Sequence, residues 1–120
     1  MTITTVVADD QALVRGGFSV LLRSAPDIEV VGEAGDGAEA VEVVLRERPD
    51  VVLMDIRMPV FDGIEATRRI IADDRTAATK ILIVTTFDLD EYVYDGLRAG
   101  ASGFLLKDTR PDMLLDAVRV

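Results

Sequence analysis

The chain of 120 residues contains no cysteine and no histidine, and these absences exclude several kinds of chemistry. Without these residues the chain cannot form a zinc finger, a thiol nucleophile, an imidazole general base or a phosphohistidine of its own. Long apolar runs are also missing: none approaches the roughly 20 residues that cross a bilayer, and the first residues lack the basic and apolar stretches of a signal peptide. We therefore predict a cytoplasmic protein without a membrane partner, whose chemistry depends on carboxylates, lysines or hydroxyl groups.

Basic residues are scarce as well, with 13 lysines and arginines against 22 acidic residues and a formal net charge of −9. A nucleic-acid-binding surface usually shows a basic stripe, so this balance argues against direct binding of the chain to DNA or RNA. The 49% of hydrophobic residues can fill the core of one domain without disulfides or a structural metal.

Short apolar runs alternate along the chain with longer segments of helical periodicity. This alternation is typical of βαβ units and of a parallel sheet whose strands are buried on both faces. The predicted strands are Ile3 to Ala8, Ile28 to Val31, Val51 to Met54, Ile81 to Val84 and Gly103 to Leu106. A βα barrel needs eight such units and about 250 residues. We therefore predict an α/β protein with one doubly wound (βα)5 domain over residues 1–120 and the flavodoxin-like strand order 2-1-3-4-5.

The last predicted helix begins at about Pro111, a residue that suits the first turn of a helix. The helical pattern reaches Val120 without Gly, Asn or another cap. From this pattern we expect that the chain is truncated within its last helix.

Polar residues follow four of the five predicted strands: Asp9 and Asp10, then Asp55, Thr85 and Lys107. In an open parallel sheet, ligands bind at the carboxyl ends of the strands where the strand order reverses, and strands 1 and 3 flank that point. Carboxylates that converge there repel one another unless a cation is bound. Oxygen ligands without His or Cys favour Mg²⁺. The sequence therefore predicts a Mg²⁺ site formed by three aspartates.

The same residues suit phosphoryl transfer. Lys107 supplies a positive charge for one phosphoryl oxygen, and Thr85 supplies a hydroxyl donor for another. Asp55 stands alone at the end of a central strand and is the candidate nucleophile, whereas Asp9 and Asp10 form a pair suited to holding the metal. The predicted product is an aspartyl phosphate.

An acidic pair after the first predicted strand, an Asp after the third, a Thr after the fourth and a Lys after the fifth resemble the receiver domain of two-component response regulators. The separations of 45 residues from Asp10 to Asp55, 30 from there to Thr85 and 22 from there to Lys107 match those of the family. The resemblance covers the whole chain.

Further motifs match the same family. Met58-Pro59 and Gly63 follow the predicted acceptor as they do in receivers. The stretch from Thr86 to Asp90 and the run from Arg98 to Asp108 are similar to the NarL/LuxR-type branch of response regulators. That branch usually adds a helix-turn-helix DNA-binding domain, which we expect in the parent protein after residue 120.

The resemblance implies roles for the residues at the site. Asp55 would accept a phosphoryl group from a sensor histidine kinase. Asp10 and Asp55 would bind Mg²⁺ directly, Asp9 would assist, and the backbone carbonyl of Arg57 would complete the protein ligands. Lys107 and Thr85 would complete the catalytic set. The chain would then be a regulatory domain rather than an enzyme, although it would catalyse its own phosphorylation and dephosphorylation.

Thr85 and Phe104 match the hydroxyl and aromatic switch positions of the family. Their coupled movement would report phosphorylation to the face formed by the fourth helix, the last strand and the last helix, and so control homodimer formation and transcriptional output. DNA would be bound only through the expected helix-turn-helix domain. Many receivers have a cis Lys-Pro bond after the last strand; here Asp108 follows Lys107, and a non-proline cis bond costs roughly 2.5–4 kcal/mol.

An aspartyl-nucleophile phosphatase of the haloacid dehalogenase type is the main alternative, because it also combines carboxylates, Thr, Lys and Mg²⁺ on a parallel sheet. Its pattern places a second Asp two residues after the nucleophile, where this chain has Arg57. A domain that keeps the fold but acts without phosphorylation is disfavoured by the complete residue set.

The segment Gly35-Asp36-Gly37-Ala38-Glu39-Ala40 superficially matches a dinucleotide-binding fingerprint. Its acidic residues would crowd a pyrophosphate with negative charge, where only backbone amides and a helix dipole are wanted. We interpret the two glycines as turn residues and Asp36 as a helix cap.

Overall fold

Strand and helix alternate five times in the computed structural model, which describes residues 2–86 and 90–120. The strands are β1 (Ile3–Ala8), β2 (Ile28–Ala34), β3 (Val51–Met54), β4 (Lys80–Thr85) and β5 (Gly103–Leu106). The helices are α1 (Ala12–Arg23), α2 (Gly37–Glu47), α3 (Gly63–Ala72), α4 (Asp90–Ala99) and α5 (Pro111–Arg119). Within these described ranges, none of the helices has the length and apolar content needed to span a membrane.

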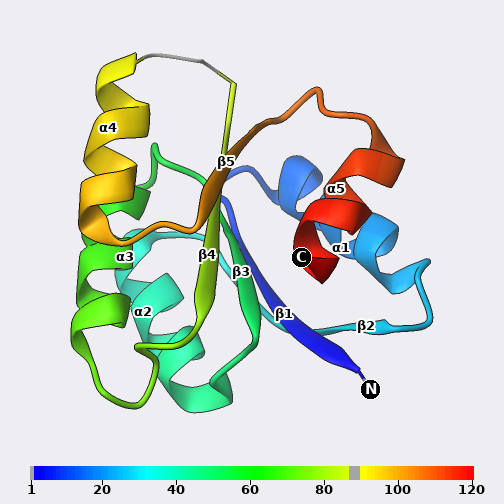
Figure 1. Ribbon diagram of the computed structural model, residues 1–120, viewed down its shortest axis with the longest axis horizontal. Helices are drawn as coiled ribbons and strands as arrows, with labels where there is room; N and C mark the ends of the chain where they lie inside the picture. The colour runs from blue at the N-terminus through cyan, green and yellow to red at the C-terminus, as the bar shows by residue number, and fades with distance from the viewer. Residues whose placement is uncertain (1, 87–89) are drawn as a thin grey trace.

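The described strands form one parallel sheet in the order β2-β1-β3-β4-β5 (Figure 1). β1 pairs directly with β3, although β2 and two helices separate these strands in the sequence. The strand order therefore reverses between β1 and β3. The predicted α/β fold and its strand order are confirmed.

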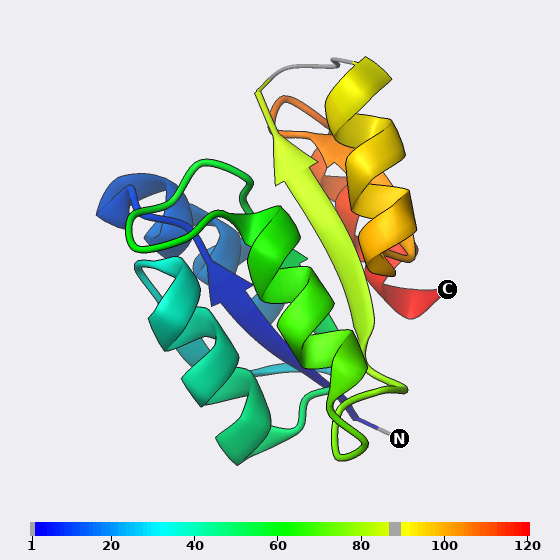
Figure 2. The same ribbon diagram turned by 90° about the vertical axis from the view of Figure 1, so that its left-hand side faces the viewer.

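Helices cover both faces of the sheet, with α1 and α5 on one face and α2, α3 and α4 on the other (Figures 1 and 2). Each face has its own apolar core. Val44, Ile70 and Ile83 belong to the core under α2, α3 and α4. Leu22 and Leu114 belong to the core under α1 and α5. Because the central strands face a core on both sides, they need continuous apolar runs, and all four residues of β3 are buried.

The predicted bounds of β1, β3 and β5 are confirmed, whereas β2 and β4 are longer than predicted. β2 continues through Gly32, Glu33 and Ala34, which pair with the last residues of β1. The predicted end of this strand at Val31 is wrong because β2 is at the edge of the sheet, where backbone pairing continues without an apolar run. β4 includes one more residue at each end than predicted.

Side-chain caps start α2 and α3, the helices that follow β2 and β3. Asp36 accepts a hydrogen bond from the N–H of Glu39 at 2.7 Å and starts α2, as predicted. Asp62 accepts one from the N–H of Glu65 at 2.9 Å and starts α3. Pro111 lies in the first turn of α5, also as predicted.

Two backbone features flank β5, one before the strand and one after it. Gly100 ends α4 with φ of +111°, a conformation that residues with a side chain rarely adopt. The peptide bond between Lys107 and Asp108 is trans, since no peptide bond of the described residues is cis.

Candidate functional site

Asp9 and Asp55 directly follow the adjacent strands β1 and β3, and their backbones continue the sheet. The N–H of Asp9 donates to the carbonyl of Ala34 at 3.0 Å, and the N–H of Asp55 donates to the carbonyl of Ala8 at 2.9 Å. These bonds fix the points at which the two side chains leave the sheet. Asp9 and Asp55 are buried, whereas Asp10 is exposed.

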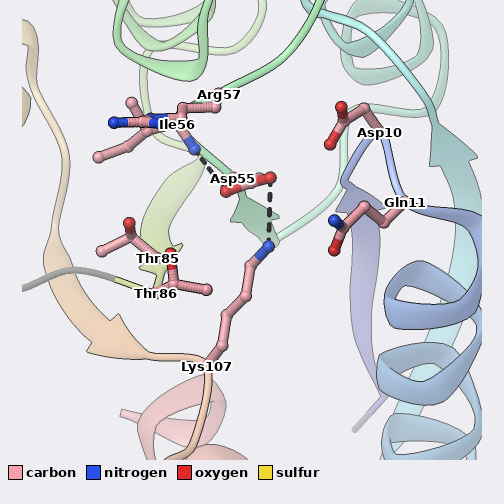
Figure 3. A pocket seen from close by; sticks show the side chains of 8 residues that line it. All are labelled: Asp10, Gln11, Asp55, Ile56, Arg57, Thr85, Thr86 and Lys107. Atoms are coloured by element: carbon pink, nitrogen blue, oxygen red, sulfur yellow. Dashed lines mark hydrogen bonds and ion pairs between the residues drawn. The ribbon is translucent and has the colours of Figure 1, made fainter.

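One carboxylate oxygen from each of Asp9, Asp10 and Asp55 lies within 4.8 Å of the other two. Lys107, which follows β5, reaches this cluster: its Nζ lies 3.0 Å from Oδ2 of Asp9 and 3.3 Å from Oδ2 of Asp55. Figure 3 shows the second of these contacts. One ammonium group therefore faces three carboxylates, and the surplus of negatively charged oxygen donors suits Mg²⁺. The predicted convergence of the three aspartates is confirmed.

The surroundings of Asp55 disfavour its ionised form. Burial and the neighbouring charge of Asp9 raise the pKa of Asp55 from 3.8 to about 6, against the opposing effects of Lys107 and of the N–H of Ile56. Burial lowers the pKa of Lys107, but the hydrogen bond to Asp9 and the charge of Asp55 outweigh burial and keep it above its ordinary value. At neutral pH the site therefore contains a cationic Lys107 and an Asp55 that is mostly ionised.

An open cavity of about 300 Å³ lies at this edge of the sheet (Figure 3). It is lined by Asp10, Gln11, Asp55, Ile56, Arg57, Thr85, Thr86 and Lys107. Asp9 does not line the cavity because its side chain is only 2% exposed, but its ion pair with Lys107 joins it to the site. The structure thus brings together the predicted catalytic residues and the predicted metal ligands.

Phe104 is the predicted site residue that lies away from the cavity. It is on β5, where it pairs with Ile83 of β4, and it packs against the core under α2, α3 and α4. Thr85 lies two residues further along β4 and is buried. The two predicted switch residues are therefore on neighbouring strands, and their coupled movement stays a prediction.

Gln11, Ile56 and Thr86 line the cavity but were not predicted from the sequence. The N–H of Ile56 donates to Oδ1 of Asp55 at 2.9 Å, and the N–H of Gln11 donates to Oδ1 of Asp9 at 2.9 Å. Backbone donors have no residue-type signal. For Gln11 and Ile56, the position immediately after an aspartate is the only feature of the sequence that could have indicated a role at the site. Thr86 directly follows the predicted Thr85.

Two further residues hold the backbone of the site. Nη1 of Arg15 donates to the carbonyl of Asp9 at 2.7 Å, and its Nε pairs with Glu33 at 3.1 Å. Gly63, at the start of α3, lies so close to Asp55 that a Cβ atom at this position would overlap the Asp55 carbonyl oxygen. Gly63 was part of the motif noted in the sequence, whereas Arg15 on its helix gave no signal.

Part of the NarL/LuxR-like stretch from Thr86 to Asp90 cannot be compared with the fold. Its residues 87–89 lie outside the described residues.

The family model for the response regulator receiver domain matches residues 5–119. The chain therefore belongs to the response regulator receiver domain family and is a regulatory component of a two-component system rather than an enzyme in the usual sense. Its relatives are of the NarL/LuxR type, as predicted.

One such relative is the uncharacterized transcriptional regulatory protein YxjL of Bacillus subtilis (strain 168), which is 50% identical over 117 residues. The alignment covers 98% of this chain and 53% of YxjL. The chain spans about half the length of the curated relatives it matches.

Solved structures of receivers have the same fold. A two-component response regulator of the LuxR family from Aurantimonas sp. SI85-9A1 has a TM-score of 0.92 and 36% identity, with 99% of this chain and 84% of that chain covered. The receiver domain of the sensor histidine kinase PA1611 from Pseudomonas aeruginosa PAO1, with a magnesium ion in its active site cleft, has a TM-score of 0.88 and 28% identity. That alignment covers 99% of this chain and 96% of the other.

Proposed function

We propose that this domain is a phosphorylation-activated switch in which Asp55 accepts a phosphoryl group from the phosphohistidine of a sensor kinase, or from a small acyl phosphate. The P–N bond of the phosphohistidine breaks and leaves its electron pair on the imidazole nitrogen, while a P–O bond forms to the Asp55 carboxylate. The observation that carries the proposal is the position of Asp55, which lines an open cavity while Lys107 and the acidic pair lie against it.

The contacts of the three aspartates support Asp55 as the acceptor. Asp9 is buried below the cavity and its two oxygens are engaged by Lys107 and by the N–H of Gln11. Asp10 is exposed and lies on the loop before α1. Asp55 is fixed at the end of a central strand, is held by the N–H of Ile56 and lines the cavity. Its pKa of about 6 leaves it ionised, and so nucleophilic, at neutral pH.

The residues present fit Mg²⁺ as the cofactor. The carboxylates of Asp10 and Asp55 would bind it directly, Asp9 would assist, and the backbone carbonyl of Arg57, which lines the same cavity, would complete the protein ligands. When bound, the ion would neutralise carboxylate and phosphoryl charge, so that an anionic donor can approach an anionic site. The receiver domain of PA1611, which shares the fold, has magnesium in its active site cleft.

Lys107 and Thr85 would hold the transferred group. The ammonium of Lys107, which lies 3.3 Å from Oδ2 of Asp55, would pair with one phosphoryl oxygen, and the hydroxyl of Thr85 would donate to another. The same groups would support loss of the phosphoryl group to water. The domain would thereby catalyse its own phosphorylation and dephosphorylation.

The signal would leave the site through Thr85 and Phe104. Movement of Thr85 toward the phosphoryl group would open space into which Phe104 turns, and this would change the face formed by α4, β5 and α5. Large hydrophobic side chains are exposed on all three elements: Tyr94 and Leu97 on α4, Leu106 on β5 and Met113 on α5. Such side chains support a role for this face in homodimer formation and in control of a helix-turn-helix domain after residue 120. The cytoplasmic location stays a prediction of the sequence.

Incubation with acetyl phosphate and Mg²⁺ tests the proposal. We expect intact-protein mass spectrometry to show one added phosphate on the wild-type chain and none on Asp55→Asn. Phosphate uptake that persists undiminished in Asp55→Asn would overturn the assignment. Steady turnover of many free phosphomonoesters would instead favour the aspartyl phosphatase, against which the receiver family match argues.

A further inference from the structure

A glycine occupies the interior of α4, where it has no evident local use. Gly96 lies between the ends of the helix at Asp90 and Ala99, and it is buried. A glycine inside a helix makes folding less favourable than alanine would, because glycine loses more backbone freedom on folding. A packing constraint at this position would explain why a side chain is absent.

The ring of Phe104 supplies that constraint. A Cβ atom at Gly96 would lie 2.7 Å from both Cε2 and Cζ of Phe104, the outer atoms of the ring, and 3.7 Å from Cγ1 of Ile83. The ring edge of Phe104 therefore rests directly on the backbone of α4. Ile83 is the residue that pairs with Phe104 across β4 and β5, so the three residues meet where helix and sheet pack together.

The other glycines in helices show that this contact is of a particular kind. At Gly37 and Gly63 a Cβ atom would overlap backbone carbonyl groups, which cannot move without shifting the chain. At Gly16 and Gly17 a Cβ atom would meet nothing within 4 Å. At Gly96 the nearest atoms belong to the free end of a side chain, which can rotate away about its own torsion angles. A methyl group at Gly96 would therefore move the ring rather than the fold.

We infer that Gly96 is a positioning residue for Phe104: the bare backbone of α4 accommodates the ring in the α4–β5 interface and sets the balance between this position and one turned toward Thr85. The inference rests on the proposed function, in which Phe104 turns when Asp55 is phosphorylated. A methyl group at Gly96 would take the space that the ring occupies in this structure, so it would shift the population toward the second position. The proposed function links the second position to phosphorylation, so a larger population there would raise the fraction of molecules that are ready to accept a phosphoryl group at Asp55.

Gly96→Ala is the direct test, with Gly17→Ala as the matched control in open space. We expect Gly96→Ala to be phosphorylated by acetyl phosphate about 5-fold faster than wild type or more, a factor at the lower end of typical allosteric coupling. Gly17→Ala should be phosphorylated at the wild-type rate. An unchanged rate in Gly96→Ala, or an equal increase in both variants, would overturn the inference.

The Phe104→Leu background separates an effect through the ring from a general effect on α4. Leucine lacks the two outer ring atoms that meet Gly96, so Gly96→Ala should change the phosphorylation rate little in this background. An equal effect in both backgrounds, or a loss of folding in Gly96→Ala that Phe104→Leu does not restore, would show that the methyl group meets something other than the ring.

An NMR measurement on the unphosphorylated protein distinguishes failure of this inference from failure of the proposed function. The chain has four phenylalanines, so ring signals of protein labelled at phenylalanine can be assigned by substitution. Gly96→Ala should shift the Phe104 ring signals and leave those of Phe18 unchanged, whether or not Asp55 accepts phosphate. Unshifted Phe104 signals would reject the inference while leaving phosphorylation of Asp55 untouched.

Discussion

Burial at the end of β3 and the charge of Asp9 both disfavour ionisation of Asp55, and Lys107 offsets them only in part. The folded chain therefore holds a carboxylate in a place that stabilises its neutral form. This conflict supports the proposed function. The charge of Asp55 is poorly compensated in the resting protein, so a cation bound at the site, with or without a phosphoryl group, would stabilise it.

Asp55→Asn should make the metal-free protein more stable at neutral pH. The pKa of Asp55 is about 6 in the folded chain against a reference value of 3.8. The free energy of unfolding therefore falls as pH rises from about 4 to 6, and this loss of stability stays constant above pH 6. Asparagine removes this loss. At about 1.4 kcal/mol per pKa unit, we expect Asp55→Asn to gain about 2–3 kcal/mol at pH 7 and almost nothing at pH 4.

Urea unfolding of both proteins in the presence of a chelator measures this difference. Acidic groups far from the site titrate alike in the two chains, so the difference between the two proteins isolates the contribution of Asp55 and its coupled neighbours. A gain that is the same at pH 4 and pH 7 would contradict the raised pKa.

At the scale of the elements, the acceptor is positioned by the way α3 packs on the end of β3. The N–H of Gly63 donates to the carbonyl of Ile56 at 2.7 Å, and its Cα lies against the carbonyl of Asp55 with no room for a side chain. The Asp62 cap fixes the first turn of α3 at this contact. The helix therefore holds the backbone on both sides of the Asp55–Ile56 peptide.

Gly63→Ala should destabilise the domain and impair phosphorylation together. The added methyl group would overlap a backbone oxygen, which can move only if α3 or the acceptor loop shifts, and we expect a loss of about 2–4 kcal/mol, in the range of severe steric substitutions. Gly17→Ala, in open space on α1, should instead gain about 0.5–1 kcal/mol. Urea unfolding curves measure both effects, and similar changes in the two variants would argue against the close packing of α3.

At the scale of the whole molecule, the proposed metal site joins segments that are far apart in sequence. Its aspartates follow β1 and β3, and Lys107 follows β5, so unfolding disperses the cluster completely. An ion that binds only the assembled site stabilises the fold by mass action.

Mg²⁺ should therefore raise the melting temperature of the wild-type chain, and a chelator should remove the increase. We expect Asp10→Ala to lose most of this response because it removes a carboxylate ligand. Arg57→Ala should retain it because only the backbone carbonyl of that residue is asked to coordinate. Thermal unfolding over a Mg²⁺ titration measures this response in all three proteins. A Mg²⁺ concentration 100-fold above the dissociation constant should stabilise the folded wild-type chain by about 2.7 kcal/mol. Equal losses in both variants would contradict the assigned ligands.

Much of the fold was predictable from the sequence because its signals are local. Apolar runs marked the central strands to within a residue, and Asp36 and Pro111 marked helix starts through caps and ring geometry that depend only on nearby residues. The edge strand β2 was predicted too short, since its pairing through Gly32 and Glu33 depends on the neighbouring strand. The aspartates, Thr85 and Lys107 could be placed at one edge because parallel strands end together.

The sequence by itself determined the fold class and the residue types at the carboxyl edge of the sheet, because periodicity and strand ends are properties of short segments. The strand order was predicted from the general rule for doubly wound sheets, and the pairing of β1 with β3 in the structure confirmed it. Only the tertiary structure decided which groups touch. It paired Lys107 with both Asp9 and Asp55, tied Arg15 to the Asp9 carbonyl and set Gly96 against Phe104. These contacts join residues from different elements, and their distances depend on how helices and sheet pack, which no local pattern specifies.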